Sequence, residues 1–229
     1  MNILIRNLQI FKSIGLPLFA LTLVYTSLDQ LLMINIDAAL KSPQGGMQLV
    51  WFYGFFSLLM GIIFPILGIL VVVYGAKTPE ANEAGLFEFV QKTIEPMSIE
   101  ILRSWGKTLL WSLLFVLPGL WKYTEYMLIP FVVALSPRYQ RGEEDALLAS
   151  AALVKNNLLK ISAILILFHL VFPTLLTVFF DDYRLIWKTP IAAVLLNLVD
   201  VFLFILSTQM LLSVFESGSQ GSPHAESYV

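Results

Sequence analysis

The sequence predicts an all-α fold: a polytopic bundle of about six transmembrane helices, with short helices at the membrane interface. Hydrophobic residues make up 58% of the 229-residue chain, charged residues only 13%, and the mean hydropathy is +0.80. This composition leaves too little polar surface to cover a water-soluble domain. Several apolar runs also approach the ~20 helical residues that span about 30 Å of hydrocarbon. The lipid bilayer is therefore the first expected partner.

Four apolar runs are each expected to cross the bilayer once: residues 14–36, 48–74, 159–180 and 190–215. The first run lacks a small-residue cleavage site and is followed by further runs, so we expect an uncleaved membrane helix. Residues 1–215 are predicted to form a single membrane-embedded domain. Residues 216–229 are polar and rich in serine and glycine, which predicts a disordered tail.

A fifth apolar block, residues 108–136, would be about 43 Å long as one straight helix, which overshoots a bilayer. Pro118 and Gly119 lie at its centre and predict either a kink in one crossing or a tight hairpin of two. Lysine and arginine near membrane ends are retained in the cytoplasm. The hairpin puts 10 basic residues inside and three outside, against eight and five for a single crossing. The sequence therefore favours six crossings with both termini in the cytoplasm.

Two connecting segments are predicted to form short helices at the interface. The first follows Thr78 and Pro79, an N-cap and a first-turn proline, and carries an apolar stripe from Leu86 to Ile94. The second, residues 143–157, begins with acidic residues and ends with a lysine, which suits the helix dipole. Both segments have the pattern of helices that lie in the membrane surface.

The central block carries a pattern of aromatic, proline and basic residues, and a more polar helix follows it. The residues of the pattern are Leu110-Trp111, Leu117-Pro118-Gly119, Lys122-Tyr123, Tyr126 and Pro130, then Ala146-Leu147, Ser150 and Lys155-Asn156-Asn157. The pattern resembles a bacterial membrane family, domain of unknown function 975, with its YciC-type relatives, although Asn156 replaces a family glycine. This resemblance implies a bacterial cytoplasmic-membrane protein of about six helices. It implies no established reaction and no catalytic residues.

Four polar residues inside the predicted spans form a candidate intramembrane site: Asp29, His169, Asn197 and Asp200. Polar groups are costly in hydrocarbon, so each is expected to have a partner. Helical spacing puts Asp29 on a polar stripe of the first span, and Asn197 and Asp200 on a polar stripe of the last. If the stripes meet, they could line a proton or cation path with His169 as a relay. Alternatively, they fix helix packing through hydrogen bonds of about 0.6–2 kcal/mol each.

Small residues recur at spacings of three and four in the second span. The members of this seam are Gly54, Ser57, Gly61, Pro65 and Gly68. A seam of small residues lets another helix backbone approach closely. Its partner is either another helix of the same chain or a second copy, so a homo-oligomer remains an alternative.

The sequence contains no complete enzyme motif. Gly106-Lys107-Thr108 is similar to the end of a phosphate-binding loop, but Ile101 stands where that loop requires glycine. The chain has no cysteine and only two histidines, so we expect no catalytic residue, metal or cofactor. Its balance of 14 basic and 16 acidic residues gives no argument for nucleic acid.

We therefore expect a non-enzymatic accessory or envelope-maintenance component of a bacterial cell membrane. Its expected partners are lipid and another membrane protein or a second copy of the chain. The alternative function is a small transporter or channel in which Asp29, His169 and Asp200 face a wet cavity. Convergence of these three side chains would favour the alternative.

Overall fold

The computed structural model describes residues 3–41, 46–76 and 85–220, and all regular structure within these ranges is helical. The elements are α1 (Ile3–Lys41), α2 (Gly46–Ala76), α3 (Leu86–Leu114), α4 (Val116–Glu125), α5 (Ile129–Leu135), α6 (Pro137–Gln140), α7 (Ala146–Leu165), the π-helical η2 (Ile166–Val171), α8 (Phe172–Phe180), the 3-10 helix η3 (Asp181–Tyr183) and α9 (Pro190–Gln220). The predicted all-α class is confirmed. The tail prediction falls mainly on residues 221–229, which lie outside the described ranges.

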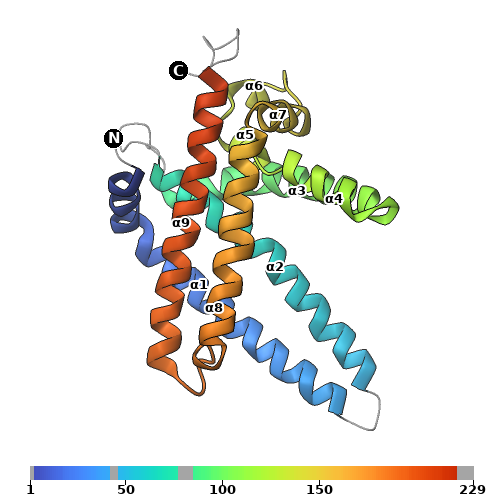
Figure 1. Cartoon of the computed structure of the whole chain (residues 1–229), viewed down its shortest axis with the longest axis vertical. Helices are drawn as coiled ribbons and strands as arrows, with labels where there is room; N and C mark the ends of the chain where they lie inside the picture. The colour runs from blue at the N-terminus through green and yellow to red at the C-terminus, as the bar shows by residue number, and fades with distance from the viewer. Residues whose placement is uncertain (1–2, 42–45, 77–84, 221–229) are drawn as a thin grey trace.

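Four helical segments are long and apolar enough to cross a membrane: Gln9–Lys41, Gly46–Ala76, Ala146–Tyr183 and Pro190–Ser219. Each contains one of the four apolar runs expected to cross. The chain reverses direction between α1 and α2, and again between α8 and α9 (Figure 1). As a result, α1 begins and α9 ends at the same end of the bundle, called here the terminal end. The opposite end, which carries Lys41 and the connection from η3 to α9, is called the loop end.

The third segment is shortened by a bend at Asn157. A straight helix of its 38 residues would be about 57 Å long, almost twice the hydrocarbon thickness. Asn157 leaves the helical conformation with φ −127° and ψ 22°, so the part of α7 before it lies across the direction of α8 in Figure 1. The side chain of Asp145 caps α7 by accepting hydrogen bonds from the Leu147 and Leu148 amides. The helix predicted for residues 143–157 is therefore present as the first part of α7, and the bend sets it at an angle to the rest of the span.

The fifth apolar block folds back on itself between α3 and α4, but the break lies at Phe115. Phe115 is extended, with φ −158° and ψ 145°, and α4 begins at the next residue. Pro118 lies in the first turn of α4, where its missing N–H leaves no helical bond unmade. At ten residues, α4 is about 15 Å long and cannot cross a bilayer. Neither six crossings nor a break at Pro118-Gly119 is confirmed.

Gly119 has a different role, because it allows α4 to pack against α3. A Cβ atom at Gly119 would lie 1.9 Å from Ser112 Oγ and 2.8 Å from Ser112 Cα. Real Cβ atoms do not approach backbone so closely, so only glycine fits at this crossing. Pro118 therefore lies in the first turn of α4, and Gly119 lets α4 pack against α3. The chain reverses at Phe115.

Two clusters of buried side chains hold the bundle together at its terminal end. One joins α2, α3, α5, α7 and α9 around α5, where every residue from Ile129 to Ala134 is buried. The other joins α1, α2 and α9 around Leu18, Val72 and Ile205. The outer half of α2 instead exposes Trp51, Phe52 and Phe55, as expected for a helix surrounded by lipid.

The small-residue seam of α2 is used in part. A Cβ atom at Gly68 would lie 2.9 Å from the Phe204 ring, so this glycine gives α9 its close approach. Ser57 contacts α1 through a hydrogen bond described below. Nothing lies within 4 Å of the corresponding positions at Gly54 and Gly61. Gly68 and Ser57 therefore have partners in the chain itself.

We expect Gly119→Ala to disrupt the packing of α4 on α3, because its methyl group would overlap Ser112. Overpacking of this kind costs about 1–3 kcal/mol. Hydrogen exchange of α4 amides in detergent should therefore accelerate. Gly106→Ala is the matched control, since nothing lies within 4 Å of its Cβ position. Equal exchange in the two variants would contradict the assigned role of Gly119.

Candidate functional site

The predicted polar residue of the first span, Asp29, joins α1 to α2. Ser57 Oγ donates a hydrogen bond of 2.8 Å to Asp29 Oδ1. One turn earlier, the Tyr25 ring stacks on Phe64 with centroids 4.4 Å apart. Asp29 thus meets the small-residue seam, which brings together two features that the sequence presented separately. The contact is a packing hydrogen bond between neighbouring helices.

The predicted polar residues of the last span, Asn197 and Asp200, have separate partners. Asn197 Nδ2 donates to Thr26 Oγ1 over 3.3 Å and so links α9 to α1. The Arg184 guanidinium donates two hydrogen bonds to the Asp200 carboxylate, at 3.1 and 3.2 Å. Both side chains of this ion pair are about one-third exposed, at 31% and 35%. Asp200 is therefore held by a residue of the loop-end connection.

A second side chain fastens the same connection. Gln30 Nε2 donates to the Arg184 carbonyl over 2.8 Å, and Gln30 Oε1 accepts from the Ile186 amide over 3.1 Å. The connection between η3 and α9 is thus held to both α1 and α9. Sequence reasoning did not identify Arg184 or Gln30. The sequence did contain a signal for this ion pair: Arg184 lies in a short connection, and the span that follows contains Asp200.

His169 lies apart from these contacts. It belongs to η2, where the wider π-helical turn precedes Pro173, whose ring would clash with the carbonyl four residues earlier. Its side chain is exposed on the outside of the bundle. No contact brings His169, Asp29 and Asp200 together, and none of the three lines either cavity described below. The arrangement lends no support to a shared ion path.

A charged network lies at the terminal end and ties α3 to α7. Arg103 Nη1 donates to both carboxylate oxygens of the buried Glu100, at 2.7 and 2.8 Å, and Nη2 donates to Asp145 over 2.9 Å. The hydrogen bond from Arg103 is the main cause that lowers the pKa of Asp145. Tyr139 donates to Glu100 over 3.3 Å, and burial raises the pKa of its phenol. The network fixes the direction in which α3 leaves the bundle.

The turn between α4 and α5 is seated on α7 by a single buried hydroxyl. Ser150 Oγ donates to the Glu125 carbonyl over 2.7 Å and accepts from the Leu128 amide over 3.2 Å. On the exposed side of the same turn, Glu125 forms an ion pair with Lys122 and accepts from Trp121 Nε1. The residues of the family-like pattern thus position the α3–α4 hairpin on the rest of the chain.

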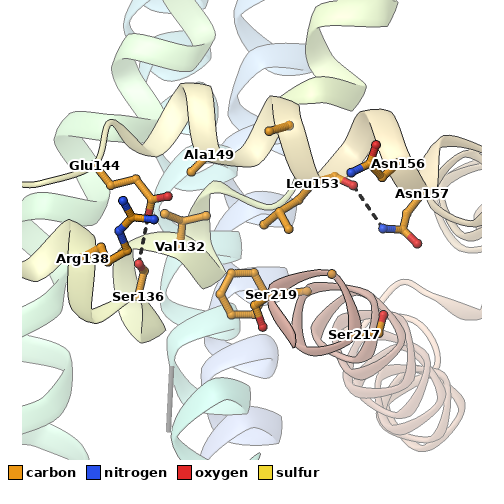
Figure 2. Close-up of a pocket in the computed structure, with 13 residues that line it drawn as sticks. Val132, Ser136, Arg138, Glu144, Ala149, Leu153, Asn156, Asn157, Ser217 and Ser219 are labelled. Atoms are coloured by element: carbon orange, nitrogen blue, oxygen red, sulfur yellow. Dashed lines mark hydrogen bonds between the residues drawn. The ribbon is translucent and has the colours of Figure 1, made fainter. Parts of the chain in front are cut away.

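A cavity of about 480 Å³ opens between α5, α6, α7 and the end of α9 (Figure 2). Arg138 and Glu144 lie together at one end, and Asn156 and Asn157 lie at the other. The wall is completed by Val132, Ser136, Ala149, Ala152, Leu153, Phe215, Ser217, Gly218 and Ser219. Glu144 accepts a hydrogen bond of 2.9 Å from Ser136. Within the described ranges, no three acidic or histidine side chains are grouped as a metal site would require.

The sequence interpretation passed over this cavity because its charged residues lie in a connecting segment, where solvated charges are common. Arg138 belongs to α6, and Glu144 precedes the N-cap of α7. Only the packing of α9 against α7 turns this segment into a wall. A smaller cavity of about 290 Å³ on α7 is lined by Trp121, Glu125, Ala151, Ala152, Val154, Lys155 and Leu158.

We expect Arg184→Ala to lower the free energy of unfolding by about 1–3 kcal/mol, because it leaves the Asp200 carboxylate without its cation in a partly desolvated position. Thermal unfolding in detergent measures the loss. Lys188→Ala, which changes an exposed residue of the same connection, is the control. Combining Arg184→Met with Asp200→Leu should recover most of the loss. A loss no larger than that of Lys188→Ala would contradict a stabilising role for this ion pair.

The chain was compared with models of protein families, with curated proteins and with solved structures. No family model matches it. No curated protein and no solved structure matches it either. The resemblance of the central block to the family described above therefore stays a prediction, and function is argued from the residues and their geometry.

Proposed function

We propose that this protein is a non-enzymatic accessory component of a bacterial cytoplasmic membrane, and that it acts through contact with lipid. The observation that carries the proposal is the α3–α4 hairpin, whose apolar tip projects from the bundle. In this proposal four membrane-spanning helices anchor the protein, and the α3–α4 hairpin lies with its apolar side chains in one leaflet. This role agrees with the envelope-maintenance function expected from the sequence.

The tip of the hairpin is too apolar to face water. Leu113, Phe115, Val116 and Leu117 are between 74% and 84% exposed. Burying one such side chain in an apolar medium gains about 1.5–3 kcal/mol, and soluble proteins rarely expose a contiguous apolar patch of this kind. Lipid is the medium that covers it in this proposal.

The residues behind the tip suit the headgroup region. Trp111 and Trp121 lie on the two arms, and tryptophan is enriched where hydrocarbon meets water. Lys107 and Lys122 also lie on the arms, where long side chains extend their charges to the headgroups. The hairpin runs across the direction of α9 (Figure 1), as a helix pair lying in the membrane surface does.

The distribution of basic residues gives the orientation. Of the 13 basic residues within the described ranges, only three, Lys41, Arg184 and Lys188, belong to the loop end. The positive-inside rule therefore favours a cytoplasmic location for the terminal end, and with it for both termini and the hairpin. Four crossings give the same excess of basic residues on the cytoplasmic side as six would. The reason is that the segments before and after the hairpin lie on the same side of the membrane whether its two arms cross or not.

The orientation is tested by single-cysteine labelling, which the cysteine-free chain allows without background. In intact cells, Arg141→Cys should resist a membrane-impermeant maleimide, whereas Lys188→Cys should react. Both positions are exposed in the structure, so burial does not explain a difference. Reaction at position 141 alone would reverse the orientation. Reaction of both or neither in intact cells would contradict the four-span arrangement.

The lipid contact of the hairpin is tested with a spin label at Leu113→Cys in nanodiscs. We expect the label to be accessible to oxygen and protected from a water-soluble nickel complex, because its side chain lies among acyl chains. Arg141→Cys should show the opposite pattern. Nickel accessibility at position 113 would assign the hairpin to water. Protection from both reagents would assign the tip to a protein interface, and either result would overturn the proposal.

A further inference from the structure

The cavity between α6, α7 and α9 carries one positive and one negative group side by side. The Arg138 side chain makes no hydrogen bond or ion pair within the described part of the chain, although it is half-buried and lines the cavity with Glu144. The pKa of the exposed Glu143 is lowered mainly by the hydrogen bond from Arg141, and the charge of Arg138 helps to lower it. One oxygen of the Glu144 carboxylate accepts from Ser136 over 2.9 Å, which leaves Oε1 as a free acceptor. The two charged side chains thus line the same cavity without forming an ion pair with each other.

The rest of the cavity is suited to an amphiphile. Val132 and Leu153 lie between the charged end and the polar end (Figure 2), and Phe215 adds a third apolar side chain to the lining. The side-chain amide of Asn156, at the polar end, has no hydrogen-bond partner in the described ranges. The volume of about 480 Å³ lies in the range of small-molecule sites. The cavity also lies beside the bend at Asn157, where α7 leaves its surface direction and becomes the span.

We infer that this cavity binds a primary-ammonium phosphodiester, the chemistry of a phosphoethanolamine headgroup. The Arg138 guanidinium presents a fork of donors that matches phosphate oxygens. The Glu144 carboxylate, held by Ser136, accepts hydrogen bonds from the ammonium, which has three donors. A ligand with only an anion or only a cation would leave one of the two charges unmatched.

This inference rests on the proposed function, because the surface position of α7 brings the cavity to headgroup level. The ligand has two sources with the same chemistry: a phosphatidylethanolamine of the bilayer, or a soluble glycerophosphoethanolamine. The surface position proposed for α7 would place the cavity against the leaflet, which favours the lipid. Charge complementarity alone does not separate the two sources, so the experiment includes both.

The test is isothermal titration of the full chain, purified in detergent, with short-chain phosphatidylethanolamine, phosphatidylcholine and phosphatidylglycerol. We expect the ethanolamine lipid to bind roughly tenfold more tightly than the other two, because trimethylammonium cannot donate to Glu144 and glycerol carries no charge. Glycerophosphoethanolamine forms a further arm. Equally tight binding of this soluble compound identifies a soluble ligand, and much weaker binding identifies the lipid. Each result supports the headgroup chemistry.

Paired variants locate the binding. Glu144→Gln keeps an acceptor for Ser136 and should abolish the preference for ethanolamine over choline. Arg138→Gln should weaken all three lipids. Arg141→Gln is the control, because this exposed residue pairs with Glu143 outside the cavity. Equal affinities of the unmodified chain for the three lipids, or an unchanged preference in Glu144→Gln, would overturn the inference.

These results separate the inference from the proposed function. If Glu144→Gln fails to fold, the inference is judged by whether the unmodified chain prefers the ethanolamine lipid. A lost preference combined with a lipid-exposed spin label at position 113 refutes the headgroup site alone. A water-exposed label combined with a retained preference refutes the hairpin proposal and leaves the headgroup chemistry standing.

Discussion

A helix that crosses a bilayer must satisfy its backbone hydrogen bonds internally and match about 30 Å of hydrocarbon, and this constraint governs the shape of the chain. Two helical regions are interrupted by a residue that leaves the helical conformation, whereas α1 is a single helix of 39 residues, about 58 Å long. Asn157 separates the first part of α7 from the part that continues into η2 and α8, and Phe115 reverses the chain between α3 and α4. Helices α3 and α4 and the first part of α7 lie at the terminal end, where they form the hairpin and part of the cavity wall. The hairpin and the cavity wall therefore begin where these two regions bend.

The two ends of the bundle use charge differently. At the loop end, Arg184 reaches back to Asp200 and Gln30 holds the backbone of the same connection, so polar contacts close the bundle. At the terminal end, Arg103 connects Glu100 with Asp145 and fixes α3 relative to α7. In that network one cation serves two carboxylates. In the cavity, by contrast, no ion pair joins Arg138 and Glu144, whereas Arg184 and Asp200 are paired at the loop end.

The candidate polar site was predicted in part. The sequence identified Asp29, Asn197 and Asp200 because polar side chains are conspicuous within apolar runs. It also identified the seam that contains Ser57 and the stripe that contains Thr26, but not that Asp29 pairs with the first and Asn197 with the second. Pairing depends on the rotation and register of each helix, which hydropathy does not encode. The cavity was not predicted at all, because its wall is assembled from segments that are distant in sequence.

The sequence by itself determined the helical class and the four apolar segments able to cross a membrane, because both follow from composition and run length along the chain. Only the tertiary structure decided where the central block reverses. Pro118 and Gly119 were the strongest local signal, yet proline is harmless in the first turn of a helix, and Gly119 is needed for its contact with Ser112. The same contact holds α4, a helix of ten residues, against α3. A surface hairpin and a pair of crossings can have the same hydropathy, and they differ in how their two helices pack. Hydropathy along the sequence does not contain that packing.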